Sequence, residues 1–417
     1  MPLSSRRDNV LNIVVDQRFK RCPEGHAWTF TPPSFDFFEP ALKVFDRVRV
    51  IARTYDVPER PERARLVCGP GVELVPIPSY VGPFEYLRRW ADVRRAIDRC
   101  AELDGAFLFR IPSQIGFLLA ERLEAQGRPY GTEVLTDPDA FFSHGVAPHG
   151  LAFLFHPYFA KRTREMCAKA VAVNYITGSR TQRLYPPTPG VWSKRISDVD
   201  LSEDAFLDID ARFARVDIDQ PVRVVSVGYL DLLAKAPDVL IRAIAAARQH
   251  GVRCELTFVG DGRLREELLQ LAARLGIGHE VHVTGALGGP GEVRRELAKA
   301  DLFALPSRAE GMPRALLEAM AAGVPAICSR VGAMEDFIED RWLIQPASLN
   351  ELTARIVDFS RSRGEWKSIA IRNQQKVRPL LNSNLEPVRL DFYRTIRDAA
   401  PLESKGAKLT EGWNHAA

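Results

Sequence analysis

Short apolar runs alternate with amphipathic segments in the second half of the chain, and this alternation limits the possible folds more than any other feature. The runs are rich in Val, Leu and Phe and cover residues 222–228, 254–260, 281–285, 302–305 and 325–328. The segments between them place apolar residues at helical spacing, over residues 238–250, 264–275, 293–300 and 314–321. Strands and helices that alternate at these intervals predict βαβ units, and therefore an α/β fold whose parallel sheet is covered on both faces.

The first half of the chain has a looser version of the same pattern. Its expected strands cover residues 12–15, 47–52, 106–109, 131–135 and 171–175. We therefore predict two Rossmann-like domains, residues 1–200 and 221–380, with the acidic stretch 201–220 as the connection between them.

The composition is that of an ordinary globular protein. The chain has 417 residues, 46% of them hydrophobic and 26% charged, with a formal net charge of +4. No basic stripe interleaved with aromatic residues stands out, so we expect no nucleic-acid partner. The six cysteines lack metal-ligand or redox-motif spacing, which indicates reduced thiols in a reducing compartment. The apolar run 10–15 is too short for a signal peptide and no run reaches spanning length, so a cytoplasmic location is expected.

The most informative motif is the segment 306–318, which follows an expected strand. Pro313 suits the first position of a helix, because its missing N–H is not needed there. The N–H groups of residues 311–316 would then form an anion site suited to a diphosphate. Glu310 lies in the loop, where it can accept hydrogen bonds from sugar hydroxyls, and Glu318 lies in the helix, where it can reach a ribose diol. Either glutamate alone also fits a solvated surface position, but the small apolar neighbours of Glu318 favour a binding role.

This segment resembles the glutamate-x7-glutamate motif of the retaining glycosyltransferases of family four, and the resemblance extends over residues 222–340. The family implies the GT-B fold, in which two Rossmann-like domains face each other across a cleft. It also implies a C-terminal helix, here within residues 381–400, that crosses back to the N-terminal domain. By this resemblance Glu310 contacts the donor sugar and Glu318 the nucleotide ribose, and transfer retains the anomeric configuration without a metal. Residues 401–417 lack periodicity and are expected to form a tail.

A glycine turn followed by a lysine, from Gly228 to Lys235, also resembles the family. The resemblance implies that Lys235 holds the diphosphate and neutralises the charge that grows on the leaving nucleotide. The family often has arginine at the position of Tyr229, so one cation is missing there or is supplied by Arg308 or Arg314.

Three further glycines resemble turns of the family's donor site. Gly260 lies in a Gly-Asp-Gly turn, Gly285 in a loop that contacts the base and Gly332 in a turn beside the sugar. A dinucleotide fingerprint would need one more glycine, so NAD is not expected. The expected donor-binding residues are Gly228, Tyr229, Gly260, Gly285, Arg308, Gly311, Met312, Pro313, Arg314, Ala315, Leu316, Glu318 and Gly332.

On the acceptor side, the pair Thr136-Asp137 follows an expected strand where many relatives carry His-Asp. Asp137 is therefore a third expected catalytic residue beside Glu310 and Lys235. The histidine of the family is absent here, so the acceptor-side or sugar-contacting role of that histidine is in doubt. His144 in the following loop is the candidate replacement, and a surface histidine is the alternative interpretation.

Motifs in the first half resemble bacterial enzymes that build exopolysaccharide or related surface glycans. This resemblance places Gly25 in a loop that closes on the acceptor. It also places Arg110 and Ser113 after a strand end, where they would line the cleft. These residues are the expected acceptor side, although each also suits a packing or turn position.

Acceptors in such pathways are often lipid-linked, and the segment 84–99 has two interpretations. It can place Phe84, Leu87, Trp90 and Ile97 on one side and arginines on the other, which suits contact with the inner face of a plasma membrane. A Rossmann helix that packs its apolar side on the sheet has the same pattern.

Together these features predict a hexosyltransferase that moves a sugar from a UDP- or GDP-sugar to a hydroxyl of a lipid-linked or oligosaccharide acceptor. The expected setting is bacterial polysaccharide biosynthesis, and neither a cofactor nor a metal is expected. Two alternatives are a nucleotide-sugar epimerase on the same scaffold and a non-catalytic relative that binds a nucleotide or glycan.

Overall fold

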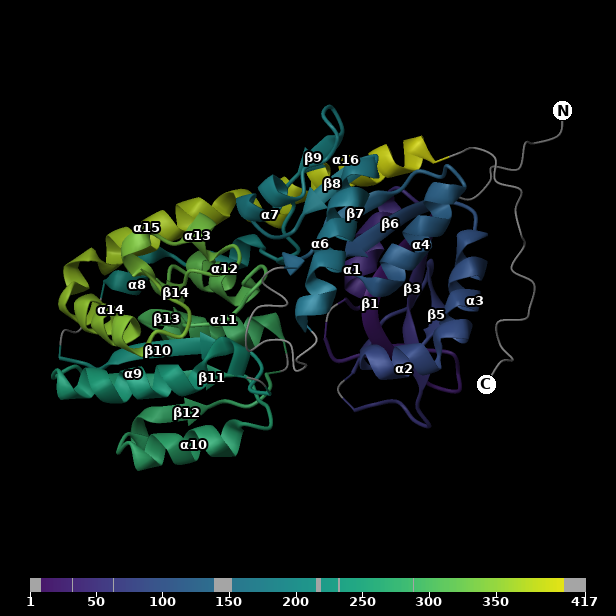
Figure 1. Ribbon diagram of the computed structural model, residues 1–417. Coiled ribbons are helices and arrows are strands. Elements are labelled where there is room, and N and C mark those ends of the chain that lie inside the picture. Colours follow the sequence, from purple (N-terminus) through teal and green to yellow (C-terminus); the bar gives the residue numbers. More distant parts are fainter. Residues whose placement is uncertain are drawn as a thin grey trace.

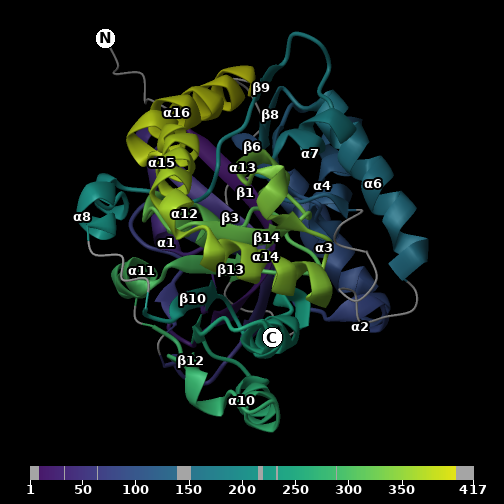
Figure 2. The same cartoon turned by 90° about the vertical axis from the view of Figure 1, so that its left-hand side faces the viewer.

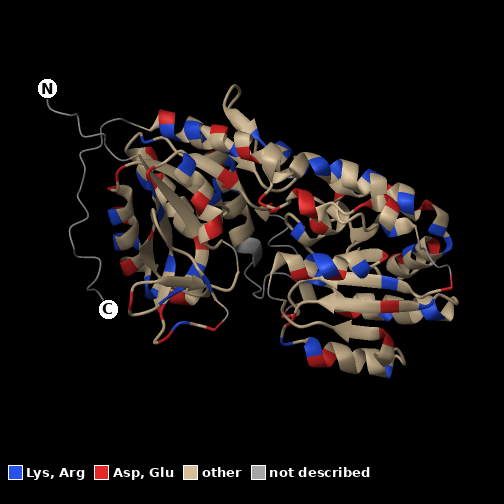
Figure 3. Ribbon diagram, turned by 180° about the vertical axis from the view of Figure 1, so that it is seen from behind, with Lys and Arg blue, Asp and Glu red and all other residues tan. Residues whose placement is uncertain are grey.

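The computed structural model describes residues 9–31, 33–62, 64–138, 152–214, 219–231, 233–287 and 289–400. They form two α/β domains that lie side by side, each built on a sheet of mainly parallel strands (Figure 1). The predicted α/β class with parallel sheets is therefore confirmed. Lys and Arg are mixed with Asp and Glu along the ribbons of both domains (Figure 3). Among the helices of these residues, none has the length and apolar character needed to cross a membrane.

The C-terminal domain has a six-stranded parallel sheet in the order β12-β11-β10-β13-β14-β15. Its strands are β10 (Val222–Val227), β11 (Cys254–Val259), β12 (Val281–Val283), β13 (Leu302–Leu305), β14 (Ala326–Ser329) and β15 (Leu343–Ile344). Its longer helices are α9 (Pro237–Gln249), α10 (Arg265–Arg274), α11 (Pro290–Lys299), α12 (Arg314–Ala321), α14 (Leu349–Arg361) and α15 (Trp366–Val377). The strands and helices expected in this half are present, with small differences at their ends. The strand order reverses between β10 and β13, and ligands of such sheets bind at this switch point, outside the carboxyl ends of the strands.

The N-terminal sheet repeats this arrangement, in the order β5-β3-β1-β6-β7-β8-β9 with parallel neighbours. Its strands are β1 (Val10–Arg21), β3 (Arg47–Asp56), β5 (Val72–Pro78), β6 (Ala106–Ile111), β7 (Gly131–Val134), β8 (Ala172–Tyr175) and β9 (Trp192–Lys194). Two short strands, β2 (Ala27–Thr29) and β4 (Arg65–Leu66), continue the sheet in antiparallel fashion. The five expected strands are confirmed, whereas β5, β9 and the antiparallel pair were not expected. β1 also runs further than expected, through a register shift between Val15 and Arg18.

Helices of the N-terminal domain lie on both faces of this sheet (Figure 1). They are α1 (Phe35–Phe38), α2 (Gly82–Arg88), α3 (Trp90–Ala101), α4 (Gln114–Ala125), α6 (Ala152–Lys169) and α7 (Ser179–Leu184). The segment 84–99 is thus divided between α2 and α3. Ile97 in α3 is buried in the core, whereas Phe84 and Leu87 in α2 are 79% and 67% exposed. The expectation that the segment 84–99 has one continuous apolar side is wrong. α3 packs on the sheet as a Rossmann helix does, whereas α2 leaves its apolar side chains exposed to solvent.

The acidic segment 201–220 is not a free connection. It contains η2 (Glu203–Ala205) and α8 (Ile209–Phe213). Leu201 and Ala205 are buried in the same core as the strands of the C-terminal domain. This part of the predicted linker therefore belongs to that domain, because its apolar side chains alternate with the acidic ones and fill the core.

The last described helix, α16 (Asn382–Ala399), runs from the C-terminal domain back along the N-terminal one (Figures 1 and 2). Phe392, Tyr393 and Ile396 are buried in the N-terminal core. The helix packs tightly on Gly131 of β7, where an added Cβ would lie 2.3 Å from Ile396 Cδ1. The helix thus connects the C-terminal domain to the core of the N-terminal domain.

Candidate active site

The loops after β10 and β13, the two strands at the switch point, bring Lys235 and Glu310 together. Lys235 Nζ lies 2.9 Å from Glu310 Oε1, and Ser307 Oγ lies 2.8 Å from the same oxygen. The Lys235 side chain is 29% exposed and that of Glu310 is 13% exposed. Because water screens charges weakly at such a position, both groups would act more strongly on a bound ligand than exposed side chains do.

Gly228 leaves the space in which the Lys235 side chain lies. A Cβ at Gly228 would lie 2.4 Å from both Cδ and Cε of Lys235. The neighbouring turn approaches just as closely, since a Cβ at Gly260 would lie 2.1 Å from the Gly228 carbonyl oxygen. An isolated backbone bridge joins Gly260 to Gly285, and Tyr229 is 60% exposed beside them. The three predicted glycines thus lie in contact one after another, and Gly228 is the one that touches the lysine.

Gly332 supports the loop that carries Glu310. It has a left-handed backbone, with φ of +59°, and a Cβ there would lie 2.5 Å from the carbonyl oxygens of Glu310 and Gly311. The Ala333 N–H donates to the Gly311 carbonyl oxygen at 3.1 Å. The turn after β14 therefore holds the Glu310 loop by direct backbone contact.

A cavity of about 330 Å³ lies between the two domains at this loop. It is lined by Thr136, Asp137, Thr177, Gly178, Arg180, Thr181, Arg308, Ala309, Glu310, Gly311, Arg330, Val331, Gly332, Glu335 and Pro346. The contact is close: a Cβ at Gly311 would lie 3.4 Å from Thr177 Cγ2 and 3.5 Å from the Leu135 carbonyl oxygen. Glu310 of the C-terminal domain and Asp137 of the N-terminal domain therefore share one cavity. Thr177, Arg180 and Arg330 were not expected as site residues, although Thr177 lies two residues after an expected strand.

Asp137 is held firmly in this cavity. Its side chain is 8% exposed. Tyr185 Oη donates to Oδ1 at 2.8 Å, and Arg180 Nε lies 3.3 Å from Oδ2. The predicted residue thus lies at the domain interface, oriented by two partners of its own domain.

A second contact fixes the domains beside the cavity. The Ser179 N–H and Oγ both donate to the Asp336 carboxylate at 2.7 Å. Arg195 lies 3.1 Å from the same carboxylate. Asp336 follows the Gly332 turn, so this contact connects the Glu310 loop to the start of α7.

The start of α12 differs slightly from the expectation. Pro313 is the residue before the first helical position, and Arg314 is the first residue of the helix. Leu316 is fully buried, so only its backbone could face a ligand. Glu318 is half-buried on α12, and among the described residues none donates a hydrogen bond to its carboxylate. Burial raises the pKa of Glu318, and Arg314 partly opposes this effect.

Arg308 lies in the site but has protein partners. Its N–H donates to the Ala234 carbonyl oxygen at 2.8 Å. Its guanidinium lies 3.3 Å from both carboxylate oxygens of Asp238. Arg308 therefore holds the turn that carries Lys235, and its charge is partly neutralised by Asp238.

Two acceptor-side predictions are wrong. Arg110 does not follow a strand end but lies within β6, where it is 7% exposed. It lies 3.0 Å from Glu133 and 3.5 Å from Asp198, and its guanidinium lies 4.3 Å from the centre of the Phe37 ring. Ser113 is fully buried and its Oγ accepts from the N–H of residue 116 at 3.1 Å, as the N-cap of α4. Both residues stabilise the domain, because a buried cation needs a partner and a helix start needs a cap.

The other two acceptor-side residues have different outcomes. Gly25 lies in the turn between β1 and β2, with φ of +83°, and its N–H donates to the Cys22 carbonyl oxygen. Its role toward an acceptor stays a prediction. His144 lies outside the described residues.

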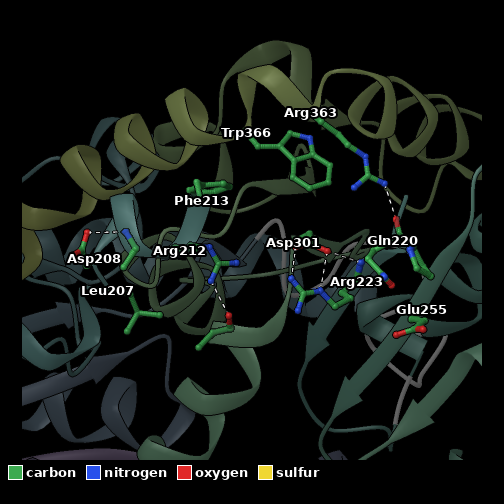
Figure 4. A pocket seen from close by; sticks show the side chains of 13 residues that line it. Leu207, Asp208, Arg212, Phe213, Gln220, Arg223, Glu255, Asp301, Arg363 and Trp366 are labelled. Atoms are coloured by element: carbon green, nitrogen blue, oxygen red, sulfur yellow. Dashed lines mark hydrogen bonds and ion pairs between the residues drawn. The ribbon is translucent and has the colours of Figure 1, made fainter. Parts of the chain in front are cut away.

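A larger cavity, of about 690 Å³, lies elsewhere on the C-terminal domain (Figure 4). It is lined by Arg212, Arg223 and Asp301, among others, near the amino ends of β10 and β13. The arginines there are already engaged: Arg223 pairs with Asp301 at 2.7 Å, and Arg212 donates to the Ala298 carbonyl oxygen at 2.9 Å. None of the predicted site residues lines this cavity. We therefore assign the chemistry to the smaller cavity, which Glu310 of the ion pair and residues of both domains line.

The described residues hold no group of three or more His, Cys, Asp or Glu side chains arranged for a metal ion. Glu310 and Asp137 of the cavity, with Lys235 paired to Glu310, are placed for hydrogen bonding and charge neutralisation. Such an arrangement can hold an anionic group beside Lys235 and hydroxyl groups beside Glu310 and Asp137.

Residues 221–362 match the family model of the glycosyl transferases group 1. The chain is 24% identical to the protein CapJ of Staphylococcus aureus, over 85% of this chain and 87% of CapJ. It is 29% identical to the amylovoran biosynthesis glycosyltransferase AmsK of Erwinia amylovora, over 40% of this chain and 43% of that protein. The C-terminal domain is thus similar to the glycosyl transferases group 1 over most of its length.

Solved structures show the same two-domain arrangement. Sucrose-phosphate synthase from Thermosynechococcus elongatus is 15% identical, with a TM-score of 0.64 over 94% of this chain and all of that one. HepE of Anabaena, in complex with UDP and glucose, is 15% identical, with a TM-score of 0.60 over 92% of this chain and 99% of that one. At such identities the likeness establishes the fold alone, and the fold is GT-B, as predicted.

Proposed function

We propose that the chain transfers a hexose from a UDP- or GDP-sugar to a hydroxyl of a lipid-linked or oligosaccharide acceptor, in the synthesis of a bacterial polysaccharide. The single observation that carries this proposal is the Lys235–Glu310 pair, whose glutamate lines a cavity that Asp137 also lines. The complex of HepE with UDP and glucose, and the names of relatives such as AmsK, support a nucleotide-sugar donor and this pathway class.

In this proposal the donor separates the ion pair. Lys235 turns to the diphosphate and neutralises the charge that develops on the leaving nucleotide. Glu310 then accepts hydrogen bonds from the transferred sugar, and Glu318 binds the ribose diol. The backbone around Gly228 and Gly332 brings the donor close to the protein.

We also propose that the anomeric configuration is retained and that no metal takes part. The family resemblance of the motif supports both points. Asp137 would orient the acceptor hydroxyl from the opposite wall of the cavity. The alternative of an epimerase finds no support in the family model or in the relatives.

The test of the donor site compares two exchanges at the ion pair with two at a similar pair outside the cavity. Lys235→Met and Glu310→Gln remove the site's charges one at a time. Lys299→Met and Glu296→Gln are the controls, because these residues also form a pair, at 2.7 Å, on α11. Binding of UDP, GDP and their sugars is measured by calorimetry, and donor turnover by release of the nucleotide.

We expect Lys235→Met and Glu310→Gln to lower donor turnover by about 100-fold or more, in line with the loss of one transition-state contact. The controls should remain close to the wild type. If all four variants turned over the donor like the wild type, the proposed site would be wrong. Nucleotide binding without any transfer, over a panel of acceptors, would favour a non-catalytic relative.

A peripheral contact with the membrane surface is part of the same proposal. Val81, Phe84, Leu87 and Trp90 are exposed on and beside α2, and Arg88 and Arg89 are exposed between them. Exposed apolar side chains flanked by cations suit an anionic bilayer. We expect the protein to sediment with vesicles that contain phosphatidylglycerol, and Phe84→Ser with Leu87→Ser to weaken this. Ile371→Ser, at an exposed apolar residue of α15, is the control, and equal losses in both would contradict the assignment.

A further inference from the structure

A carboxylate of the C-terminal domain holds the first turn of a helix in the N-terminal domain. The carboxylate belongs to Asp336 in α13 (Met334–Phe337), and the helix is α7. Asp336 Oδ2 accepts from the Ser179 N–H and Oδ1 accepts from Ser179 Oγ, both at 2.7 Å. Arg195, directly after β9, adds a cation 3.1 Å from Oδ2. Three donors of one domain thus converge on one side chain of the other, and this group is here called the Asp336 contact.

The backbone of the N-terminal domain leaves room for this carboxylate. Gly178 precedes α7, and a Cβ there would lie 2.5 Å from Asp336 Oδ2 and 3.4 Å from Ala333 Cα. A residue with a side chain at position 178 would therefore push the carboxylate away from Ser179. The Asp336 side chain is 25% exposed, so the Asp336 contact is partly shielded from water.

The helix α7 depends on outside contacts for its order. It has six residues, which is too short for a helix to be stable by itself. Its N-cap residue is Gly178, which has no side chain to accept from the first N–H groups. A hydrogen bond of 2.8 Å between Thr177 Oγ1 and Thr181 Oγ1 holds the first turn from within the domain. Asp336 supplies the acceptor that the N-cap lacks, and it does so only when the two domains lie together.

The first turn of α7 also carries a partner of Asp137. Arg180, next to Ser179, places its Nε 3.3 Å from Asp137 Oδ2. Because the Arg180 side chain is 61% exposed, this ion pair is too weak to fix the turn by itself. Tyr185, which donates to Asp137 Oδ1, is buried in the domain core and is held independently of Asp336. Arg180 is therefore the partner of Asp137 whose position depends on the Asp336 contact.

The backbone beside Asp336 is connected to the loop of Glu310. The Asp336 N–H donates to the Ala333 carbonyl oxygen, and the Ala333 N–H donates to that of Gly311, both at 3.1 Å. Arg180 and Glu310 line the same cavity from opposite domains. The Asp336 contact therefore sets the position of one wall of this cavity relative to the other.

We propose that Asp336 is a positioning residue that acts on Asp137 through α7 and Arg180. When the domains lie together, the Asp336 carboxylate orders the first turn of α7, and this turn brings Arg180 to Asp137. When the domains separate, Ser179 loses its acceptor and the Asp137 carboxylate loses this partner. Asp137 is thus fully oriented only in the closed cleft. This inference rests on the proposed function, in which Asp137 orients the acceptor hydroxyl.

The first test measures amide hydrogen exchange of α7 by mass spectrometry, on the full chain without substrate. The variants are Asp336→Ala, which removes the whole contact, and Asp336→Asn, which keeps an oxygen acceptor for Ser179 but loses the charge. The control is Glu339→Ala. Glu339 lies in the same segment and pairs within its own domain, with Arg372 at 2.6 Å.

We expect the amides of residues 179–185 to exchange about tenfold faster or more in Asp336→Ala, since hydrogen bonds to a charged group are lost there. The increase should be smaller in Asp336→Asn and absent in Glu339→Ala. Unchanged exchange of α7 in Asp336→Ala would overturn the inference. A rise spread equally over both domains would overturn it as well.

The second test separates an action on Asp137 from an action on Glu310. It measures kcat by nucleotide release at saturating acceptor, and the Kd for UDP or GDP by calorimetry. Asp336→Ala should lower kcat about tenfold and leave Kd unchanged, and it should lower kcat little further in an Asp137→Asn background. Independent losses that multiply in the double variant would overturn the path through Asp137.

Failure of the inference and failure of the proposed function give different results, because hydrogen exchange needs no substrate. If α7 depended on Asp336 but the wild type transferred no sugar to any acceptor, the proposed function would be wrong while the ordering of α7 by Asp336 stood.

Discussion

Replacing Gly332 with alanine should displace the loop that carries Glu310. An added Cβ would lie 2.5 Å from the carbonyl oxygens of Glu310 and Gly311, whereas ordinary contact begins at 3.4 Å. The loop would have to move by about 1 Å, and a misplacement of that size at a reacting group costs about 100-fold in rate. The left-handed backbone at Gly332 adds a cost of about 1–2 kcal/mol in stability for any residue with a Cβ.

Gly276→Ala is the matched control for this exchange. Gly276 is also left-handed, with φ of +71°, but no heavy atom lies within 4 Å of its added Cβ. Both variants should therefore lose similar stability from the backbone, measured by thermal unfolding. Only Gly332→Ala should lose donor turnover, measured by nucleotide release at saturating acceptor. If the two variants kept the same kcat/KM, the proposed support of Glu310 by Gly332 would be refuted.

Three further predictions concern the N-terminal domain. Arg110→Met should destabilise it by about 3–5 kcal/mol in urea unfolding, because Glu133 is left as an unpaired buried charge; unchanged stability would contradict this. Ser113→Ala should lower the thermal midpoint through the loss of an N-cap contribution of about 1 kcal/mol, without changing nucleotide affinity. In the folded protein the pKa of Asp16 is about 6, against 3.8 for an exposed aspartate. The folded state is therefore more stable when Asp16 is protonated. Wild-type stability relative to Asp16→Asn should therefore be highest below pH 4, fall as the pH rises through 6, and then level off; a constant difference would contradict this. We expect a fall of about 1 kcal/mol, since a third of the side chain is exposed and screened.

The corrected residues show why sequence patterns find some sites and not others. The segment 306–318 could be interpreted because a strand, a loop and a helix follow each other directly, so one stretch of sequence carries a whole corner of the site. Arg110 and Ser113 could not be placed in this way. Whether a polar residue near a strand end faces a cleft or a buried partner depends on the elements that pack against it. Here Arg110 packs against Glu133, and Ser113 caps the start of α4.

The sequence by itself determined the alternation of strands and helices, and therefore two parallel sheets and the positions of Lys235, Glu310 and Asp137 just beyond their strands. These features follow from periodicity and local turns, which involve neighbours along the chain. Only the tertiary structure decided which strand ends lie next to each other. The order of the strands brings Asp16, Arg53 and Tyr80 to one edge, and the approach of the two domains places Asp137 in the cavity of Glu310. Such contacts join residues far apart in the chain, and no local pattern records them.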